Sequence, residues 1–140
     1  MTTENVGASG KRGLGRAGET VARDWLIKNG YSIVRMNYTV KGGEIDIIAE
    51  DEKYIVFTEV KTRTKGHSVE KYGRPASAVD PEKSRHVIHA AKEYLRTGTQ
   101  VCAKKPRIDV IEVELEYFDG FVAAQIRHYK NAVIDRREEV

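Results

Sequence analysis

The feature that most constrains the fold of this chain is a pair of strand-like segments, residues 44–50 and 54–62, joined by a short acidic turn. Both segments are rich in β-branched or aromatic side chains, and Asp51-Glu52 between them favours a reversal of the chain. Side chains on a strand alternate between two faces. One face of the second segment therefore carries Ile55, Phe57, Glu59 and Lys61. Two charged residues thus interrupt an otherwise apolar face.

The register of this hairpin decides how Asp46 meets Glu59. With a two-residue turn Asp46 lies diagonal to Glu59, and with a four-residue turn Glu50 pairs with Ile55 and Asp46 lies directly opposite Glu59. Either even loop brings Asp46, Glu59 and Lys61 to one face, whereas an odd loop without a bulge separates them. Two adjacent carboxylates repel each other, and one lysine neutralises only one of them. The pattern therefore indicates a hard divalent cation, Mg²⁺ or Mn²⁺, bound by carboxylate oxygens.

The same residues also admit a purely structural interpretation, in which Asp46 pairs with Lys61 on an exposed strand. The apolar neighbours Ile48 and Phe57 argue against it, because acids inserted into an apolar face tend to be functional. Beside a bound metal ion, Lys61 could position or deprotonate a water molecule or neutralise developing charge.

The rest of the chain predicts a single α/β domain with helices flanking a central mixed sheet. Residues 1–13, rich in glycine, serine, threonine and charge, are expected to form a flexible arm, and residues 135–140 a charged tail. The expected elements of the domain, residues 14–134, are a helix over 14–29 ended by Gly30, strands over 31–38, 44–50 and 54–62, a polar loop over 63–79, a helix from Asp80-Pro81 to about Gly98, and strands over 107–116 and 121–129. The order is αβββαββ.

Composition excludes several classes of protein. A length of 140 residues fits one domain, and a net charge of +3 permits a polyanionic partner without requiring one. The single cysteine, Cys102, excludes an internal disulfide, and the four histidines show no spacing typical of metal ligands. The sequence contains neither an apolar run of about 20 residues nor an apolar leader, so we expect a cytoplasmic protein with no membrane partner.

The motifs together resemble a known family. Asp46, followed after twelve residues by Glu59-Val60-Lys61, resembles the D-x(n)-E-x-K core of the PD-(D/E)xK nuclease superfamily. Over about residues 13 to 134 the chain is similar to the YraN-like family of small bacterial proteins. The segments that carry this resemblance include Gly15-Arg16-Ala17-Gly18-Glu19, Gly43-Glu44-Ile45-Asp46, Phe57-Thr58-Glu59-Val60-Lys61-Thr62-Arg63 and Arg107-Ile108-Asp109-Val110. Ile45 replaces the proline expected before the first aspartate, and proline is not a ligand.

The resemblance implies a restriction-endonuclease-like fold akin to archaeal Holliday-junction resolvases. It implies a metal-dependent endonuclease that hydrolyses DNA, with branched or junction structures among its candidate substrates. Asp46 and Glu59 would be metal ligands, Glu19 on the first helix a further acid and ligand, and Lys61 the catalytic lysine. The alternative is a non-catalytic nucleic-acid-binding module with the same fold. A homodimer stays open, since a resolvase-like role favours a two-fold pair of sites.

Several of these residues have an equally simple alternative role. Glu19 near the start of a helix is favoured by the helix dipole alone. The residues predicted to contact nucleic acid are Arg16, Arg63, Lys65 and Lys83. For Arg16 and Arg63 the alternative is a salt bridge to an acidic residue, and for Lys83 it is simple solvation. For Asp109 we predict a structural hydrogen bond or ion pair, with Arg107 beside it on the same segment.

Overall fold

The computed structural model describes residues 10–65, 81–97 and 104–132, which form two helices and five strands. The elements are α1 (Gly10–Lys28), β1 (Ser32–Val40), β2 (Gly43–Glu50), β3 (Tyr54–Thr64), α3 (Pro81–Thr97), β4 (Lys105–Phe118) and β5 (Phe121–Tyr129). This confirms the predicted α/β class and the order αβββαββ. The predicted arm up to residue 9, most of the predicted 63–79 loop, Cys102 and the 135–140 tail lie outside the described residues.

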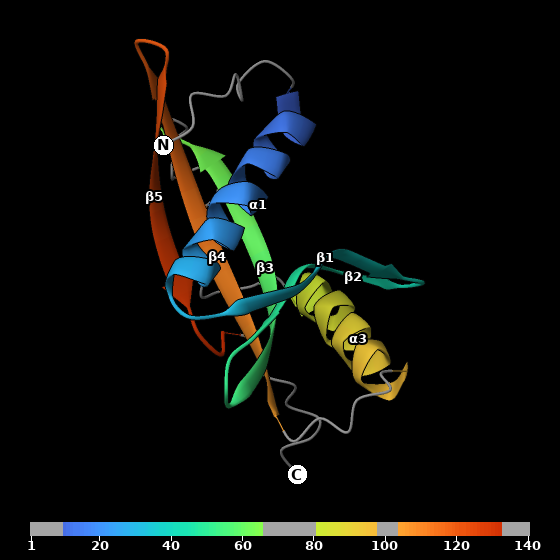
Figure 1. Ribbon diagram of the computed structural model, residues 1–140. Helices are drawn as coiled ribbons and strands as arrows, with labels where there is room; N and C mark the ends of the chain where they lie inside the picture. Colours follow the sequence, from blue (N-terminus) through green and yellow to red (C-terminus); the bar gives the residue numbers. More distant parts are fainter. Residues whose placement is uncertain (1–9, 66–80, 98–103, 133–140) are drawn as a thin grey trace.

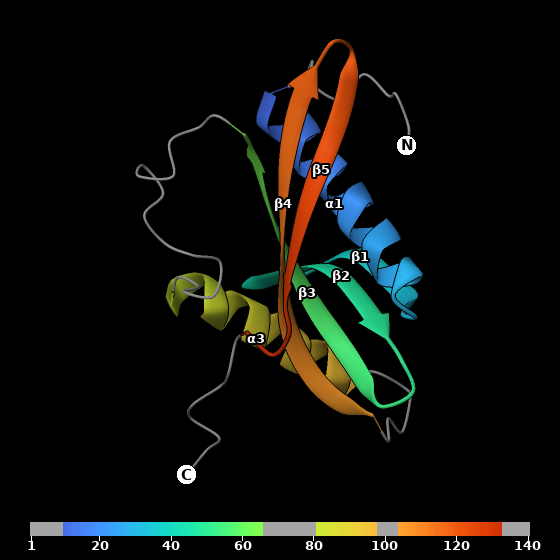
Figure 2. The ribbon, with the colours of Figure 1, turned by 90° about the vertical axis from the view of Figure 1, so that its left-hand side faces the viewer.

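The five strands form one sheet in the order β1-β2-β3-β4-β5. Only the β3–β4 pair is parallel, and the other neighbouring pairs are antiparallel, so the sheet is mixed as predicted. The parallel pair requires a crossover, and α3 lies within it. The helices α1 and α3 lie on opposite sides of the sheet (Figure 1). Figure 2 shows the same arrangement from the side, with the sheet between the two helices.

Three elements are longer than the sequence predicted. The first helix begins at Gly10 rather than Leu14, so residues 10–13, which we assigned to the flexible arm, are helical. Strand β3 continues to Thr64 because its parallel pairing with β4 runs as far as Leu115. Strand β4 runs from Lys105, opposite Tyr54 on β3, to Phe118, opposite Phe121 on β5. The polar residues after residue 62 predict the end of this strand, but pairing with a neighbouring strand overrides that local preference.

Helix α1 covers one face of the sheet through a stripe of small and apolar residues. Its buried residues Ala17, Ala22 and Leu26 pack on Val56, Ile111 and other apolar residues of the strands. The helix ends as predicted at Gly30, whose φ of 92° is readily adopted only by glycine. The amide of Gly30 donates to the carbonyl of Ile27 at 3.1 Å, which closes the last turn.

Helix α3 covers only part of the opposite face. Its buried residues Val87, Ala90 and Ala91 pack on Ile55 and Phe57, at the beginning of β3. Farther along β3 the side chains on this face are Glu59, Lys61 and Arg63. The half of this face that α3 leaves uncovered is therefore polar, and it begins where the apolar contact with α3 stops.

The β1–β2 hairpin bends sharply at Asn37, whose φ is 53°. As a result Tyr38 and Ile45 face the α3 side of the sheet, whereas Met36 and Ile47 face the α1 side. The tip of the bent hairpin packs on α3 so closely that a Cβ on Gly43 would lie 2.3 Å from the backbone carbonyl oxygen of His86. Asp46 lies opposite Asn37, at the bend itself.

Candidate functional site

The candidate site lies where β2 leaves β3. Their pairing runs from Glu50 opposite Ile55 to Ile47 opposite Thr58, which is the four-residue-turn register among the two alternatives. In this register Asp46 and Glu59 are the next two residues. The bend turns β2 away at this point, and the amide of Val60 donates a hydrogen bond of 2.8 Å to Oδ2 of Asp46. The carboxylate of Asp46 thereby replaces the missing strand partner of Val60.

The surroundings of Asp46 resist its ionisation. The pKa of its carboxyl is raised from 3.8 to about 6. Burial is the largest cause, and the negative charges of Glu19 and Glu59 add to it, against the lowering effects of the Val60 amide and of Lys83. This position is unfavourable for an ionised aspartate on its own, because a buried carboxylate is costly without a compensating positive charge.

Glu59 is only 3% exposed, and its two oxygens differ in their surroundings. The Nζ of Lys83, in the first turn of α3, donates to Oε1 at 3.0 Å. Oε2 is buried and has no hydrogen-bond partner among the described residues. Buried polar oxygens are nearly always hydrogen-bonded, and an unsatisfied one costs about 1–3 kcal/mol. The structure therefore contains a buried oxygen with unused capacity to bind a cation.

Glu19 reaches this site from α1. Burial raises the pKa of its carboxyl, a hydrogen bond with Asn37 lowers it, and the charge of Glu44 raises it again. Glu19 also acts on the pKa of Asp46, so the two carboxylates are electrostatically coupled. Helix α1 and the bent hairpin thus bring a third acid toward Asp46, and a role of Glu19 as a metal ligand stays a prediction.

Lys61 lies two residues beyond Glu59 on β3 and is partly buried. Residues two apart on a strand point to the same face, so Lys61 and Glu59 share the α3 side of the sheet. No described residue forms an ion pair or hydrogen bond with its ammonium group. The alternative pairing of Lys61 with Asp46 is therefore absent, and it is Lys83 that neutralises a site carboxylate.

The donor set of this site is suited to a hard cation. Among residues 10–65, 81–97 and 104–132, no three histidine, cysteine, aspartate or glutamate side chains form a preformed metal-binding group. Mg²⁺ needs no such group, because it is commonly held by one or two carboxylates together with water and substrate phosphate. Asp46 and the unpartnered Oε2 of Glu59 fit that description.

The predicted nucleic-acid contacts are partly engaged in ion pairs. Arg63 pairs with Glu112 at 2.9 Å, Lys65 with Glu116 at 3.4 Å, and Lys83 with Glu59 at 3.0 Å. Arg16 is exposed on α1. The salt-bridge alternative is thus correct for Arg63, whereas Lys83, for which the alternative was solvation, pairs with Glu59. Contact with nucleic acid stays a prediction for all four residues.

A buried polar network on the α1 side was only half predicted. Arg107 donates two hydrogen bonds of 2.8 Å to Asp109, which confirms the structural role expected of Asp109. Nε2 of His128 lies 2.7 Å from the same carboxylate, and the indole N–H of Trp25 donates to Nδ1 of His128 at 3.3 Å. Sequence analysis missed His128 because its partners lie far away in the chain and only the fold brings them together.

The fold and site define an α/β protein with a mixed sheet and an acidic site at the point where two strands part. The model of the uncharacterised protein family UPF0102 matches residues 18–113, and the chain belongs to this family. This match confirms the family resemblance found in the sequence motifs. None of the helices in the described part of the chain is both long and apolar enough to span a membrane.

Bacterial relatives align over most of their length. The UPF0102 protein of Geobacter metallireducens is 43% identical over 123 residues, which cover 86% of this chain and 92% of the relative. That of Caldicellulosiruptor bescii is 40% identical over 107 residues, covering 76% and 84%. That of Carboxydothermus hydrogenoformans is 35% identical over 123 residues, covering 88% and 97%.

Proposed function

We propose that this protein is a metal-dependent endonuclease that hydrolyses phosphodiester bonds in DNA. One observation carries the proposal. Two carboxylates, Asp46 and Glu59, meet at the end of the β2–β3 pairing, with one buried oxygen unpartnered and with Lys61 on the same face. This arrangement is unfavourable for a protein that only has to fold, and favourable for one that holds a cation against a phosphate.

Each side chain of the site has its own role in the proposed reaction. Asp46 and Glu59 hold Mg²⁺ or Mn²⁺, with Glu19 as a further acid near Asp46. A divalent ion at such a site lowers the pKa of bound water and stabilises charge on the phosphate. The hydrogen bond from Val60 fixes one oxygen of Asp46 and leaves the other for the ion. Lys61, unpaired among the described residues, orients the water or neutralises charge at the scissile phosphate.

The alternative, a nucleic-acid-binding module without turnover, is favoured by one contact. Lys83 already neutralises Glu59 through Oε1, so part of the negative charge is balanced without any metal. A binding module would retain its affinity for DNA when the charge of Asp46 is removed, since fewer negative charges then face the phosphates. A nuclease would lose cleavage.

The test is cleavage of labelled duplex, single-stranded, flap and four-way-junction DNA with Mg²⁺ or Mn²⁺ and with EDTA. Wild type should cut only with metal, and Asp46→Asn, Glu59→Gln and Lys61→Met should each cut at least about 100-fold more slowly. The control is Glu52→Gln, a similar change at an exposed turn residue, which should cut like wild type. If no DNA is cut while binding persists, the binding module is the correct function.

A cut in both strands of a duplex or junction calls for two active sites, which a two-fold dimer would provide. Sedimentation analysis with and without four-way-junction DNA measures the oligomeric state. A complex with one protein chain per junction would contradict the dimer and leave the chemistry of the single site untouched.

A further inference from the structure

A row of charged side chains crosses the sheet beside Lys61. In the β3–β4 register Lys61 pairs with Glu112, and in the β4–β5 register Glu112 pairs with Arg127. Paired residues on neighbouring strands project to the same face. Lys61, Glu112 and Arg127 therefore form a continuous row from the candidate site to the edge strand β5, on the part of the sheet that α3 leaves uncovered.

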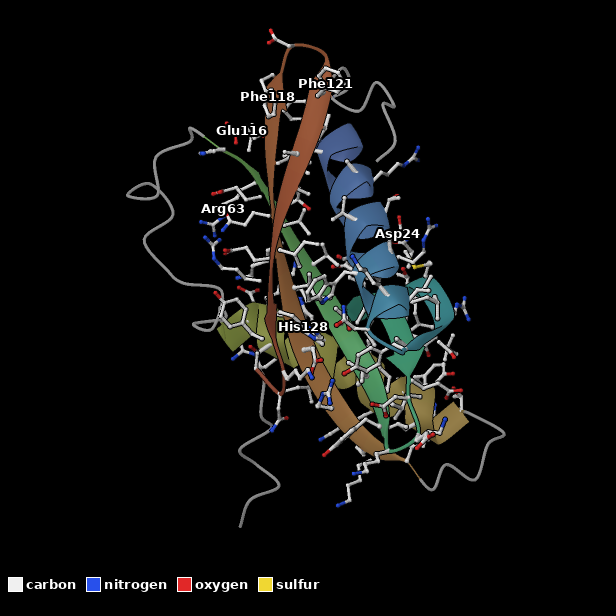
Figure 3. The ribbon with its side chains drawn as sticks, turned by 60° about the vertical axis from the view of Figure 1, so that its left-hand side comes forward. Asp24, Arg63, Glu116, Phe118, Phe121 and His128 are labelled. Carbon is white, nitrogen blue, oxygen red and sulfur yellow. The ribbon has the colours of Figure 1, made fainter. Side chains whose placement is uncertain are left out.

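Glu112, at the centre of this row, is buried and holds two arginines. Nη2 of Arg63 donates to one of its oxygens at 2.9 Å, and Nη1 of Arg127 donates to the other at 2.8 Å. Each guanidinium uses one nitrogen for this contact and retains most of its five N–H donors. Figure 3 shows Arg63 on the side of the sheet away from α1. One arginine would neutralise a buried glutamate, so the second guanidinium exceeds what the stability of Glu112 requires.

The next acid along β4, Glu114, does not neutralise the positive charge of Arg63 and Arg127. Glu114 lies one step farther from Lys61, next to Arg63 and Gln125 in the strand registers. It forms no ion pair with any described residue. Arg127 is 44% exposed, so a guanidinium fixed by Glu112 remains accessible to a ligand from solvent. Such pre-orientation lowers the entropy cost of binding and suits the planar, forked contact of arginine with phosphate.

We propose that Arg63 and Arg127, held in place by Glu112, form a binding site for a backbone phosphate of nucleic acid. The identity of the ligand rests on the proposed function, because the row begins at Lys61. Strands lie about 4.8 Å apart, so Lys61 and Arg127 are separated by roughly 10 Å at the backbone and contact different phosphates. The row therefore gives the nucleic acid a direction across the sheet, from β3 toward β5.

The experiment measures binding, independently of cleavage. The affinity for a fluorescein-labelled DNA duplex is followed by fluorescence anisotropy in EDTA over a series of KCl concentrations. Each phosphate contact contributes about 0.9 to the slope of log affinity against log salt concentration. Arg127→Gln should make this negative slope less steep by about 0.9 and should weaken binding at every salt concentration. Arg127→Lys, which keeps the charge, should restore the slope.

The matched control is Arg23→Gln. Arg23 is 42% exposed and paired with a carboxylate, Asp24, much as Arg127 is 44% exposed and paired with Glu112, but it lies on α1, which covers the other face of the sheet. Its substitution should leave the slope unchanged. Thermal unfolding of each variant confirms that the fold is retained, and if Arg127→Gln does not fold, Arg63→Gln replaces it in the same measurement.

The outcomes separate the two proposals. If wild type binds no DNA, both are wrong. If the slopes of the arginine variants equal that of wild type while metal-dependent cleavage is found, the phosphate site is wrong and the nuclease stands. If the slope falls while no DNA is cut with any metal, the phosphate site stands on a binding module.

Discussion

At the scale of single residues, the folded structure disfavours the ionised form of Asp46. Its carboxyl is largely buried and lies near two other acids, Glu19 and Glu59. Positions of this kind reduce stability, and they are common at functional sites, where the ligand supplies the missing charge. The structure of the protein alone thus implies a measurable effect of the Asp46 charge on folding.

Asp46→Asn should stabilise the metal-free protein at neutral pH. The pKa of Asp46 is about 6 in the folded protein and 3.8 as its ordinary value, so protonation favours the folded state. That contribution is complete below pH 3.8 and is lost as the pH rises through about 6. At pH 7.5 in EDTA the variant should be more stable by about 1–3 kcal/mol, and the difference should disappear toward pH 4. Urea unfolding at each pH measures it, and a variant less stable than wild type at pH 7.5 would contradict the burial of an ionised Asp46.

Adding Mg²⁺ should reverse the order of stability, so that wild type becomes more stable than Asp46→Asn. An ion that binds only the folded state raises its stability according to concentration and affinity, by about 2.7 kcal/mol at a hundredfold excess over Kd. Wild type should therefore gain in Tm with added Mg²⁺, while Asp46→Asn should gain much less. Differential scanning fluorimetry with Mg²⁺ and with NaCl of equal ionic strength separates binding from screening. An equal gain in both proteins would place the ion elsewhere.

At the scale of secondary-structure elements, the contact between α1 and β3 depends on one glycine. A Cβ on Gly18 would lie 1.7 Å from Oγ1 and 2.8 Å from Cβ of Thr62. Rotation of the threonine would remove the first clash but not the second, because Cβ does not move with χ1. Gly18 precedes Glu19, so the closeness of helix and strand also determines how near Glu19 comes to Asp46.

Gly18→Ala should destabilise the protein by about 1–3 kcal/mol, since it forces α1 away from β3. The control is Gly15→Ala in the same helix, where nothing lies within 4 Å of the added Cβ. That change should stabilise by about 0.5–1 kcal/mol, as replacing glycine by alanine does in an open helix position. Urea unfolding of both variants measures the two effects, and a pair of changes with the same sign would contradict the close approach of helix and strand.

At the scale of the whole molecule, the carboxylate of Asp109 joins segments that are far apart in the sequence. It accepts hydrogen bonds from Arg107 on β4, from His128 on β5 and from the amide of Asn131 beyond β5. Trp25 extends this network to α1. Although burial raises the pKa of Asp109, the hydrogen bonds from His128, Arg107 and the Asn131 amide lower it more, so that the net pKa lies below 3.8. Its stabilising contribution is present above pH 3.8 and is lost as the pH falls below that value.

Asp109→Asn should therefore destabilise the protein by about 3 kcal/mol or more at pH 7, because Arg107 loses the buried carboxylate that neutralises it. The matched control is Asp24→Asn, at an aspartate with a 64% exposed side chain that also pairs with an arginine. Its effect should stay within about 0.5 kcal/mol. Equal losses in the two variants, measured by urea unfolding, would mean that the network adds nothing beyond an ordinary surface pair.

The sequence was sufficient for the order of elements and for placing Glu59 and Lys61 on one face, because strand alternation is a local property. It placed Asp46 on that face only on condition that the hairpin loop is even. It left the hairpin register open between two even loops, and the Glu50–Ile55 pair resolved it. The bend at Asn37 escaped prediction, because a positive φ is uncommon at non-glycine residues, although asparagine adopts it more readily than most.

Two features depended on contacts that no local pattern reveals. Glu112 was not singled out from the sequence, because the two arginines that it binds come from β3 and β5. His128 and Trp25 are 103 residues apart in the chain. The polar loop predicted over residues 63–79 lies almost wholly outside the described residues.

The register of the β2–β3 hairpin has a consequence for the evolution of the family. Four residues separate Glu50 from its partner Ile55, and each inserted or deleted residue shifts the following strand by one position. A single insertion would turn Glu59 and Lys61 to the α1 side and place Thr58 or Val60 where they now lie. Length changes between these strands are therefore compatible with the candidate site only in steps of two residues, or of one residue absorbed by a bulge. Natural relatives that carry the same acids should show this parity in the length of their turn, and a library of turn lengths would reveal it as alternating loss and recovery of metal binding.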